Sequence, residues 1–103
     1  MRELMERMFI AETYKVKGLE ACIEEIVPSE KEALKIHKKD MKEKNRKFGQ
    51  LGFKVTYVAS VLRVLVGVMA TAYCCDSKEN VLEVVEKLEK LTKDLRDTIE
   101  GGK

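Results

Sequence analysis

The segment from Lys54 to Cys75, KVTYVASVLRVLVGVMATAYCC, constrains the fold most, because it is the least polar stretch and carries only Arg63 as a charge beyond its first position. Val, Thr and Tyr favour strands. Ordinary strands, however, have about five or six residues, and no Asn-Gly, Asp-Gly or proline divides this segment into a hairpin. Its length therefore predicts one helix over residues 53–75.

A membrane span is one alternative for this helix. The eight Val and Leu residues in 55–75 contribute about −0.3 to −0.6 kcal/mol each to insertion, whereas one arginine costs about +2.5 to +3.5 kcal/mol. The two contributions nearly cancel. A basic segment before the helix and an acidic one after it would satisfy the positive-inside rule. The near balance makes a single-span membrane protein the less favoured hypothesis.

In a soluble chain the same helix needs a cover, because it is apolar almost all round, whereas a helix in an isolated bundle leaves one face in water. A second copy of the chain is the simplest cover. We therefore expect a homo-oligomer with this helix at its centre. The face that would let two backbones approach carries mostly small residues, namely Thr56, Ser60, Arg63, Gly67, Thr71 and Cys74.

Arg63 would be buried in such an assembly and would need a carboxylate partner, because an unpaired buried guanidinium is too costly. It lies about twelve residues from the upper end of its helix, at 1.5 Å per residue. The same depth along the other helices gives the candidate partners Glu12, Asp40, Glu86 and Glu89.

Three further helices are expected. Apolar residues recur at mostly three- and four-residue intervals from Leu4 to Val27, which predicts one helix over residues 2–27 that Gly18 loosens and that Pro28 ends. Ser29 resembles an N-cap for a second helix over residues 30–48, which Gly49 and Gly52 terminate. Asp76 or Ser77 caps the last helix, whose apolar residues repeat in a coiled-coil manner at Val81, Val84, Val85, Leu88, Leu91, Leu95 and Ile99.

Short connections make sequential helices antiparallel. The prediction is therefore an all-α protein, a single domain over residues 1–103, folded as an up-down-up-down four-helix bundle with the third helix central. The high content of Lys and Glu is typical of thermophile proteins. The N-terminus lacks the features of a signal peptide, so we expect a cytoplasmic protein.

The one electrostatic feature is the second helix, since residues 28–54 hold nine basic and four acidic side chains. Such a footprint suits nucleic acid or anionic lipid. Nucleic-acid binding is therefore an alternative function. The residues that would form this face are Lys31, Lys35, Lys38, Lys39, Lys42, Lys44, Arg46 and Lys47.

No catalytic, cofactor-binding or metal-binding residue is predicted. The three cysteines, Cys22, Cys74 and Cys75, and the single histidine, His37, lack the C-x₂-C or H-x₃-H spacing of zinc sites. Cysteines in this odd number are expected to be free and to act as small apolar residues, and a Cys22 disulfide to Cys74 or Cys75 is the minor alternative. No P-loop or nucleophile elbow occurs. The sequence therefore favours a non-enzymatic self-association or protein-interaction module and identifies no small-molecule ligand.

Overall fold

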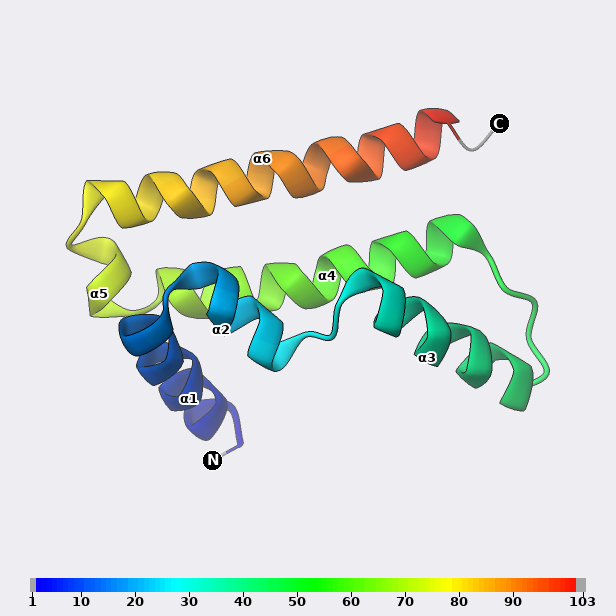
Figure 1. Ribbon diagram of the computed structural model, residues 1–103, viewed down its shortest axis with the longest axis horizontal. Coiled ribbons are helices and arrows are strands. Elements are labelled where there is room, and N and C mark those ends of the chain that lie inside the picture. The colour runs from blue at the N-terminus through cyan, green and yellow to red at the C-terminus, as the bar shows by residue number, and fades with distance from the viewer. Residues whose placement is uncertain (1, 102–103) are drawn as a thin grey trace.

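The computed structural model describes the backbone of residues 2–101 and the side chains of residues 5–101, so the side chain of Leu4 lies outside the described residues. Over this part of the chain every regular element is a helix, which confirms the all-α prediction (Figure 1). The helices are α1 (Arg2–Lys17), α2 (Leu19–Ile26), α3 (Glu30–Glu43), α4 (Gln50–Met69), α5 (Ala72–Cys75) and α6 (Lys78–Gly101).

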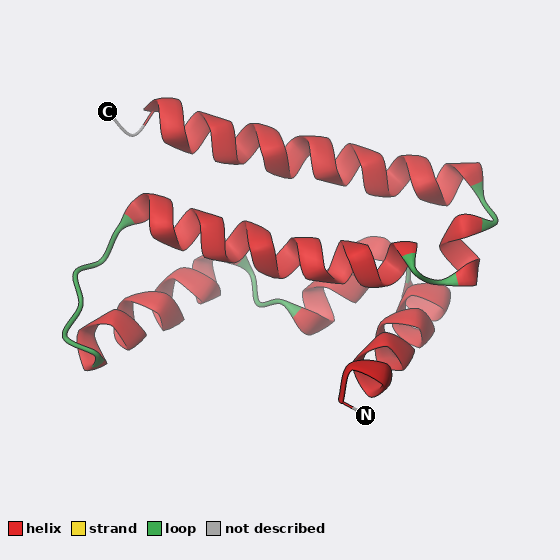
Figure 2. Ribbon diagram, turned by 180° about the vertical axis from the view of Figure 1, so that it is seen from behind, coloured by secondary structure: helices red, strands yellow, loops and turns green. Residues whose placement is uncertain are grey.

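The long helices α4 and α6 form an antiparallel pair along the length of the molecule, with α5 at the turn between them (Figure 1). We call this pair the α4–α6 hairpin. α1 and α3 project from α4 at an angle (Figure 1), and α2 lies behind α4 in the opposite view (Figure 2). The up-down-up-down bundle within one chain remains a prediction, because only the hairpin has that arrangement along its whole length.

The expected single helix from residue 2 to residue 27 is wrong, because the chain breaks at Gly18. This glycine has a φ of 89°, a left-handed conformation that glycine adopts without steric cost. The buried face of α1 contains Ile10 and Tyr14, whereas Met8 is exposed. The periodicity that continues through to Val27 therefore predicts the wrong buried face for α1, the part before the break.

The second helix begins as expected and ends early. The Ser29 hydroxyl accepts a hydrogen bond from the Glu32 backbone N–H at 3.2 Å, which confirms the N-cap. α3 ends at Glu43, short of the expected Phe48, and Asn45 then adopts a positive φ of 55°. Asparagine is one of the few residues that tolerates this conformation, so it stops the helix before the glycines.

The third helix is also shorter than expected at its C-terminus, because the chain turns after Met69. The buried Thr71 hydroxyl donates to the Val68 carbonyl at 2.8 Å and accepts from the Cys74 N–H at 3.2 Å. These bonds start the separate turn α5. Ser77, rather than Asp76, caps α6 by accepting from the Asn80 N–H.

The core is built around α4, the helix that was expected to be central. α4 contacts each of α1, α2, α3, α5 and α6. Its fully buried side chains meet residues of α2, α5 and α6 in one cluster. The largest fully buried side chains are Leu65, Val61, Val64, Val68, Val84, Cys22 and Cys74.

Candidate interaction surfaces

One flank of α4 is apolar and exposed along the whole helix. Val66 is 65% exposed, and Val55 and Met69 are nearly half exposed. At about 100° per residue these side chains share one arc, and Val66 lies about 160° around the helix from the buried Val64. No charged residue lies within that arc, which contains Leu51, Gly52, Val55, Ala59, Leu62, Val66, Met69 and Ala70.

α6 carries two apolar stripes side by side. The first packs on α4 through the buried Val84 and Leu91, with the partly buried Leu88 and Leu95 at its edge. The second stripe adjoins it, and its apolar members Val81, Val85 and Ile99 are exposed.

The second stripe of α6 faces the same side as the exposed flank of α4. Lys87 lies 3.4 Å from Glu20 of α2, so this side of α6 faces α2. Val81 and Val85 lie about 120° and 160° around the helix from Lys87, and therefore point away from α2. In Figure 2 the hairpin is seen from this side, and no helix crosses in front of it.

We call this two-helix surface the hairpin face. It joins the exposed flank of α4 to the second stripe of α6, and its polar content is low. Its residues are Leu51, Val55, Ala59, Leu62, Val66, Met69 and Ala70 of α4 and Val81, Val85, Leu88, Thr92, Leu95 and Ile99 of α6.

The six residues expected at an oligomer interface occupy different surroundings. Thr71 and Cys74 are buried within the chain. A Cβ atom on Gly67 would lie 2.7 Å from Ile10 Cδ1, so this glycine provides the close approach of α1 to α4. The remaining three, Thr56, Ser60 and Arg63, line a groove beside the hairpin face. The small-residue face thus packs partly against the chain's own α1.

The burial of Arg63 was expected in an assembly and stays a prediction, whereas in the single chain Arg63 pairs with a carboxylate other than the four candidates. Its side chain is 77% exposed, and its nearest ion-pair partner is Glu6 of α1, with Nη2 and Oε1 3.7 Å apart. The candidates Glu12, Asp40, Glu86 and Glu89 were deduced from a parallel-sided bundle. Ile10 of α1 instead packs at Gly67, so Glu6, one turn before Ile10, meets Arg63, one turn before Gly67.

The groove lies over α4, between α1 and α3, and has a volume of about 1010 Å³. Phe9 and Ile36 form its apolar walls, while Glu6, Glu25 and Asp40 bring three carboxylates to its lining. His37 lies in the wall from α3, with its ring 5.9 Å from that of Phe48 and 5.5 Å from that of Phe53. The histidine is therefore packed in a seam with aromatic neighbours.

All eight residues of the expected basic face are exposed, and α3 has no buried residue. Lys35 lies 3.9 Å from Glu32 and Lys44 lies 3.2 Å from Asp40, so two of the charges are partly neutralised. Lys38 lies 5.2 Å from the centroid of the Phe48 ring. The structure thus keeps the basic face open to solvent.

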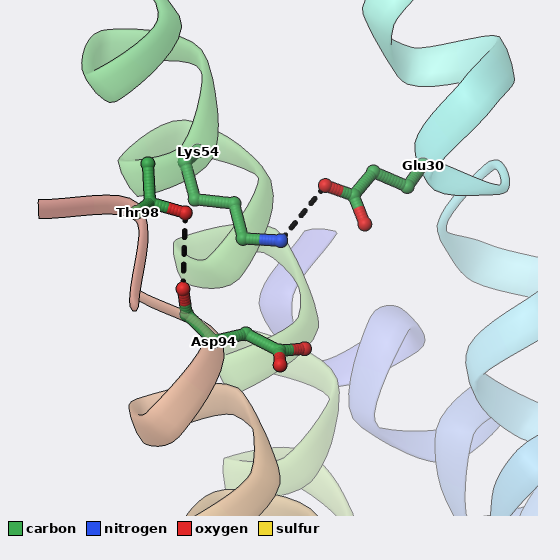
Figure 3. A network of polar contacts seen from close by, with 4 residues as sticks. All are labelled: Glu30, Lys54, Asp94 and Thr98. Carbon is green, nitrogen blue, oxygen red and sulfur yellow. Dashed lines mark hydrogen bonds and ion pairs between the residues drawn. The ribbon is translucent and has the colours of Figure 1, made fainter. Parts of the chain in front are cut away.

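The sequence interpretation missed Lys54, the buried cation of α4. Its Nζ lies 2.8 Å from Glu30 Oε2, and this ion pair joins α4 to the start of α3 (Figure 3). Its spacing from Val61 and Leu65 puts Lys54 on the buried arc of the helix. Helical phase could have revealed its burial, but the partner required the tertiary structure.

The buried thiols and the buried Tyr14 phenol of the core are held in their neutral forms at neutral pH. Burial is the main cause that raises the pKa of the Cys22 and Cys74 thiols above 9.0. Burial, followed by the nearby Cys74 and Glu83, raises the pKa of Tyr14 from 10.0 to about 12. A reactive cysteine needs a lowered pKa and solvent access. Cys22 and Cys74 therefore behave as the small apolar residues that the sequence predicted, and all three cysteines are free.

Two further results bear on function. Among the described residues, α4 is the one helix whose length and composition would allow it to cross a membrane, and less than half of its least polar window is buried in the chain. In the same part of the chain no three His, Cys, Asp or Glu side chains are grouped closely enough to hold a metal ion.

No protein-family model, curated protein or solved structure matches this chain. The functional argument therefore depends on the surfaces of the molecule. Of these, the hairpin face, the groove and the basic face are distinct in shape and charge.

Proposed function

We propose that the protein is a non-enzymatic helical module that associates with a second copy of itself through α4. The observation that carries this proposal is the apolar flank of α4, exposed from Leu51 to Met69. Burial of this apolar surface between two copies would stabilise the complex by about 25 cal/mol per Å². Contiguous apolar surface on a soluble domain typically marks a contact with a protein or a membrane.

Self-association accounts for α4 better than a membrane span does. In a span the buried side of α4 would leave its contacts with α1, α2 and α6 and would face lipid. Arg63 would enter the bilayer, where a cation at the centre of a span opposes insertion by about 2.5 to 3.5 kcal/mol on translocon scales. Lys54, near the N-terminal end of α4, would lose its partner Glu30. Packing against another protein leaves both ion pairs intact.

Size-exclusion chromatography with light scattering, without detergent, tests the proposal. One chain has a mass of 11.8 kDa. We expect a mass of two chains or a higher multiple at micromolar concentration, with dissociation on dilution. A mass of one chain throughout the micromolar range would contradict self-association.

Nucleic-acid binding by the basic face is a second candidate function, favoured by the exposure of all eight of its cations. The acidic residues Glu30, Glu32, Asp40 and Glu43 interrupt this face, and only Phe48 lies among its lysines as an aromatic side chain. Backbone phosphate contacts would carry such binding, since it has few side chains on which bases could stack.

Binding to a labelled DNA or RNA duplex should then fall steeply with salt, with a slope of about −0.9 per phosphate neutralised on B-DNA. Replacing Lys38 and Lys42 of α3 by glutamate should weaken it further. The matched control replaces Lys90 and Lys93 of α6 in the same way. Fluorescence anisotropy at low salt measures both, and equal weakening by the two pairs, or no binding at all, would eliminate the basic face as a specific site.

A further inference from the structure

We infer that the hairpin face is a self-complementary dimer surface on which two copies of the α4–α6 hairpin pack face to face about a two-fold axis, giving a four-helix core shared by two chains. This inference rests on the proposed self-association and adds the surface, the contribution of α6 and the symmetry. The spacing, charge and size of the face all fit a second copy.

The second stripe of α6 has the spacing of a coiled-coil seam. With Leu88 and Leu95, which it shares with the edge of the first stripe, its positions alternate by four and three residues from Val81 to Ile99. Such a seam is symmetric about its midpoint, here Lys90, so two antiparallel copies match layer by layer. The layers pair Val81 with Ile99, Val85 with Leu95, and Leu88 with Thr92.

The exposed flank of α4 has the same property. Its positions are symmetric about the peptide bond between Ser60 and Val61, and the layers pair Leu51 with Ala70, Val55 with Val66, and Ala59 with Leu62. A two-fold axis through this midpoint therefore also brings the α4 flanks of two copies into register.

The two midpoints lie at nearly the same level of the hairpin, so one axis serves both helices. Figure 3 shows Lys54 of α4 at the level of Asp94 and Thr98 of α6. The midpoint of α4 lies beyond Lys54 towards the C-terminus. Because α6 is antiparallel, the same distance from Asp94 and Thr98 towards the N-terminus of α6 leads to the neighbourhood of Lys90. All neighbouring helices in the resulting core are antiparallel, the arrangement that short-loop bundles use.

The charges around the hairpin face suit a second copy. The centre of the face is uncharged. Its rim on α6 carries both signs through Lys78, Glu89 and Arg96, and its rim beside α4 does so through Arg63 with Glu6 and Arg7 of α1. Like-charge contacts disfavour association. The basic face of α3 would repel its own copy, whereas the hairpin face, which has no charge at its centre, would not.

The size of the face is also sufficient. The shorter helix, α4, has 20 residues, so two helices side by side offer about 30 Å by 20 Å, or about 600 Å² per copy. Two copies would bury about 1,200 Å², the lower bound of stable protein interfaces. A single partner helix would leave part of this two-helix surface in water.

Charge substitutions on the intact chain test which surface associates. Val66→Glu and Val85→Glu place a carboxylate in the face, one on each helix. Val16→Glu on α1 and Leu82→Glu on α6 are matched controls, because both side chains are exposed and lie outside the face. Analytical ultracentrifugation measures the dimer dissociation constant, and circular dichroism checks that each variant keeps the helical content of the wild type.

We expect each face variant to raise the dissociation constant by about 100-fold or more, because an ionised carboxylate would be desolvated in the interface. The controls should change it by less than about threefold, as rim or surface substitutions typically do. If the wild type is a dimer and the control substitutions weaken it as much as the face substitutions do, the inference about the hairpin face is overturned. The proposed self-association would then still hold.

A monomeric wild type would overturn the proposed function as well as the inference. Flotation with phosphatidylglycerol vesicles then tests a lipid occupant. Flotation that Val66→Glu and Val85→Glu abolish would assign the face to a lipid surface, and no flotation would exclude an anionic lipid surface as its occupant.

A cysteine pair tests the two-fold axis independently. Val81→Cys and Ile99→Cys are combined in a Cys75→Ser background, which removes the exposed native thiol. The two positions lie about 27 Å apart within one helix, so a disulfide between them must join two chains. Oxidation by air with copper phenanthroline should give a covalent dimer from the pair and not from either single cysteine. Equal cross-linking of the single variants would contradict the proposed register.

Discussion

Replacing Leu65 by alanine is expected to lower the free energy of unfolding by about 3 kcal/mol, within the range of about 2 to 5 kcal/mol for buried leucines. Leu65 is completely inaccessible to solvent and lies in the cluster where α4 meets α2, α5 and α6. Alanine removes the apolar transfer free energy of the side chain and leaves a cavity that tightly packed neighbours fill only in part.

The matched control is Leu82→Ala on α6, where the leucine is exposed and lies outside the hairpin face. This variant should change stability by less than about 0.5 kcal/mol, as surface substitutions usually do. Urea unfolding monitored by circular dichroism measures both, at one protein concentration because self-association adds to apparent stability. Equal losses in the two variants would show that Leu65 is not in the core.

Replacing Gly67 by leucine is expected to separate α1 from α4. The new Cβ would lie 2.7 Å from Ile10 Cδ1 and 3.3 Å from its Cγ2, closer than side-chain atoms pack. Overpacking costs about 1 to 3 kcal/mol, partly offset by about 1 kcal/mol of helix propensity gained on replacing glycine. We expect a net loss of stability and faster hydrogen exchange in the C-terminal half of α1.

Gly52→Leu is the control for helix propensity, because no atom lies within 4 Å of its added Cβ. Both leucine variants are made in a Val66→Glu background, since Gly52 lies in the exposed arc of α4 and a leucine there would otherwise alter self-association. It should stabilise the chain by up to about 1 kcal/mol, so the two leucine variants should differ by about 2 kcal/mol and in opposite directions. If Gly67→Leu were as stable as Gly52→Leu and left the exchange of α1 unchanged, the close α1–α4 contact would be contradicted.

Local signals in the sequence identified the helices and several of their ends. Ser29 caps α3 as predicted, since a hydroxyl at that position satisfies a free N–H of the first turn. The complete break at Gly18 and the early end of α3 near Asn45 were not predicted. Each depends on a single residue that adopts a left-handed conformation, and the wider residue pattern at both places favours a continuing helix.

The candidate surface was predicted only in part. The sequence indicated that the Val-rich helix lacks a complete cover within one chain, and the exposed flank of α4 agrees with this. It placed the uncovered side at Thr56, Ser60 and Arg63, about a quarter-turn from Val66. Those three residues line the groove beside the hairpin face. A helix that is apolar almost all round has no polar face to fix its orientation, so the sequence does not decide which open side a second copy would cover.

Periodicity and composition are local properties, and they sufficed to establish a helical chain with one unusually apolar helix and one basic helix. The direction in which each helix points depends on contacts between residues far apart in the sequence. Gly67 against Ile10, Lys54 with Glu30, and Lys87 with Glu20 fix those directions. Because these contacts cover one side of the α4–α6 hairpin and leave the other open, the location of the hairpin face followed from the folded chain alone.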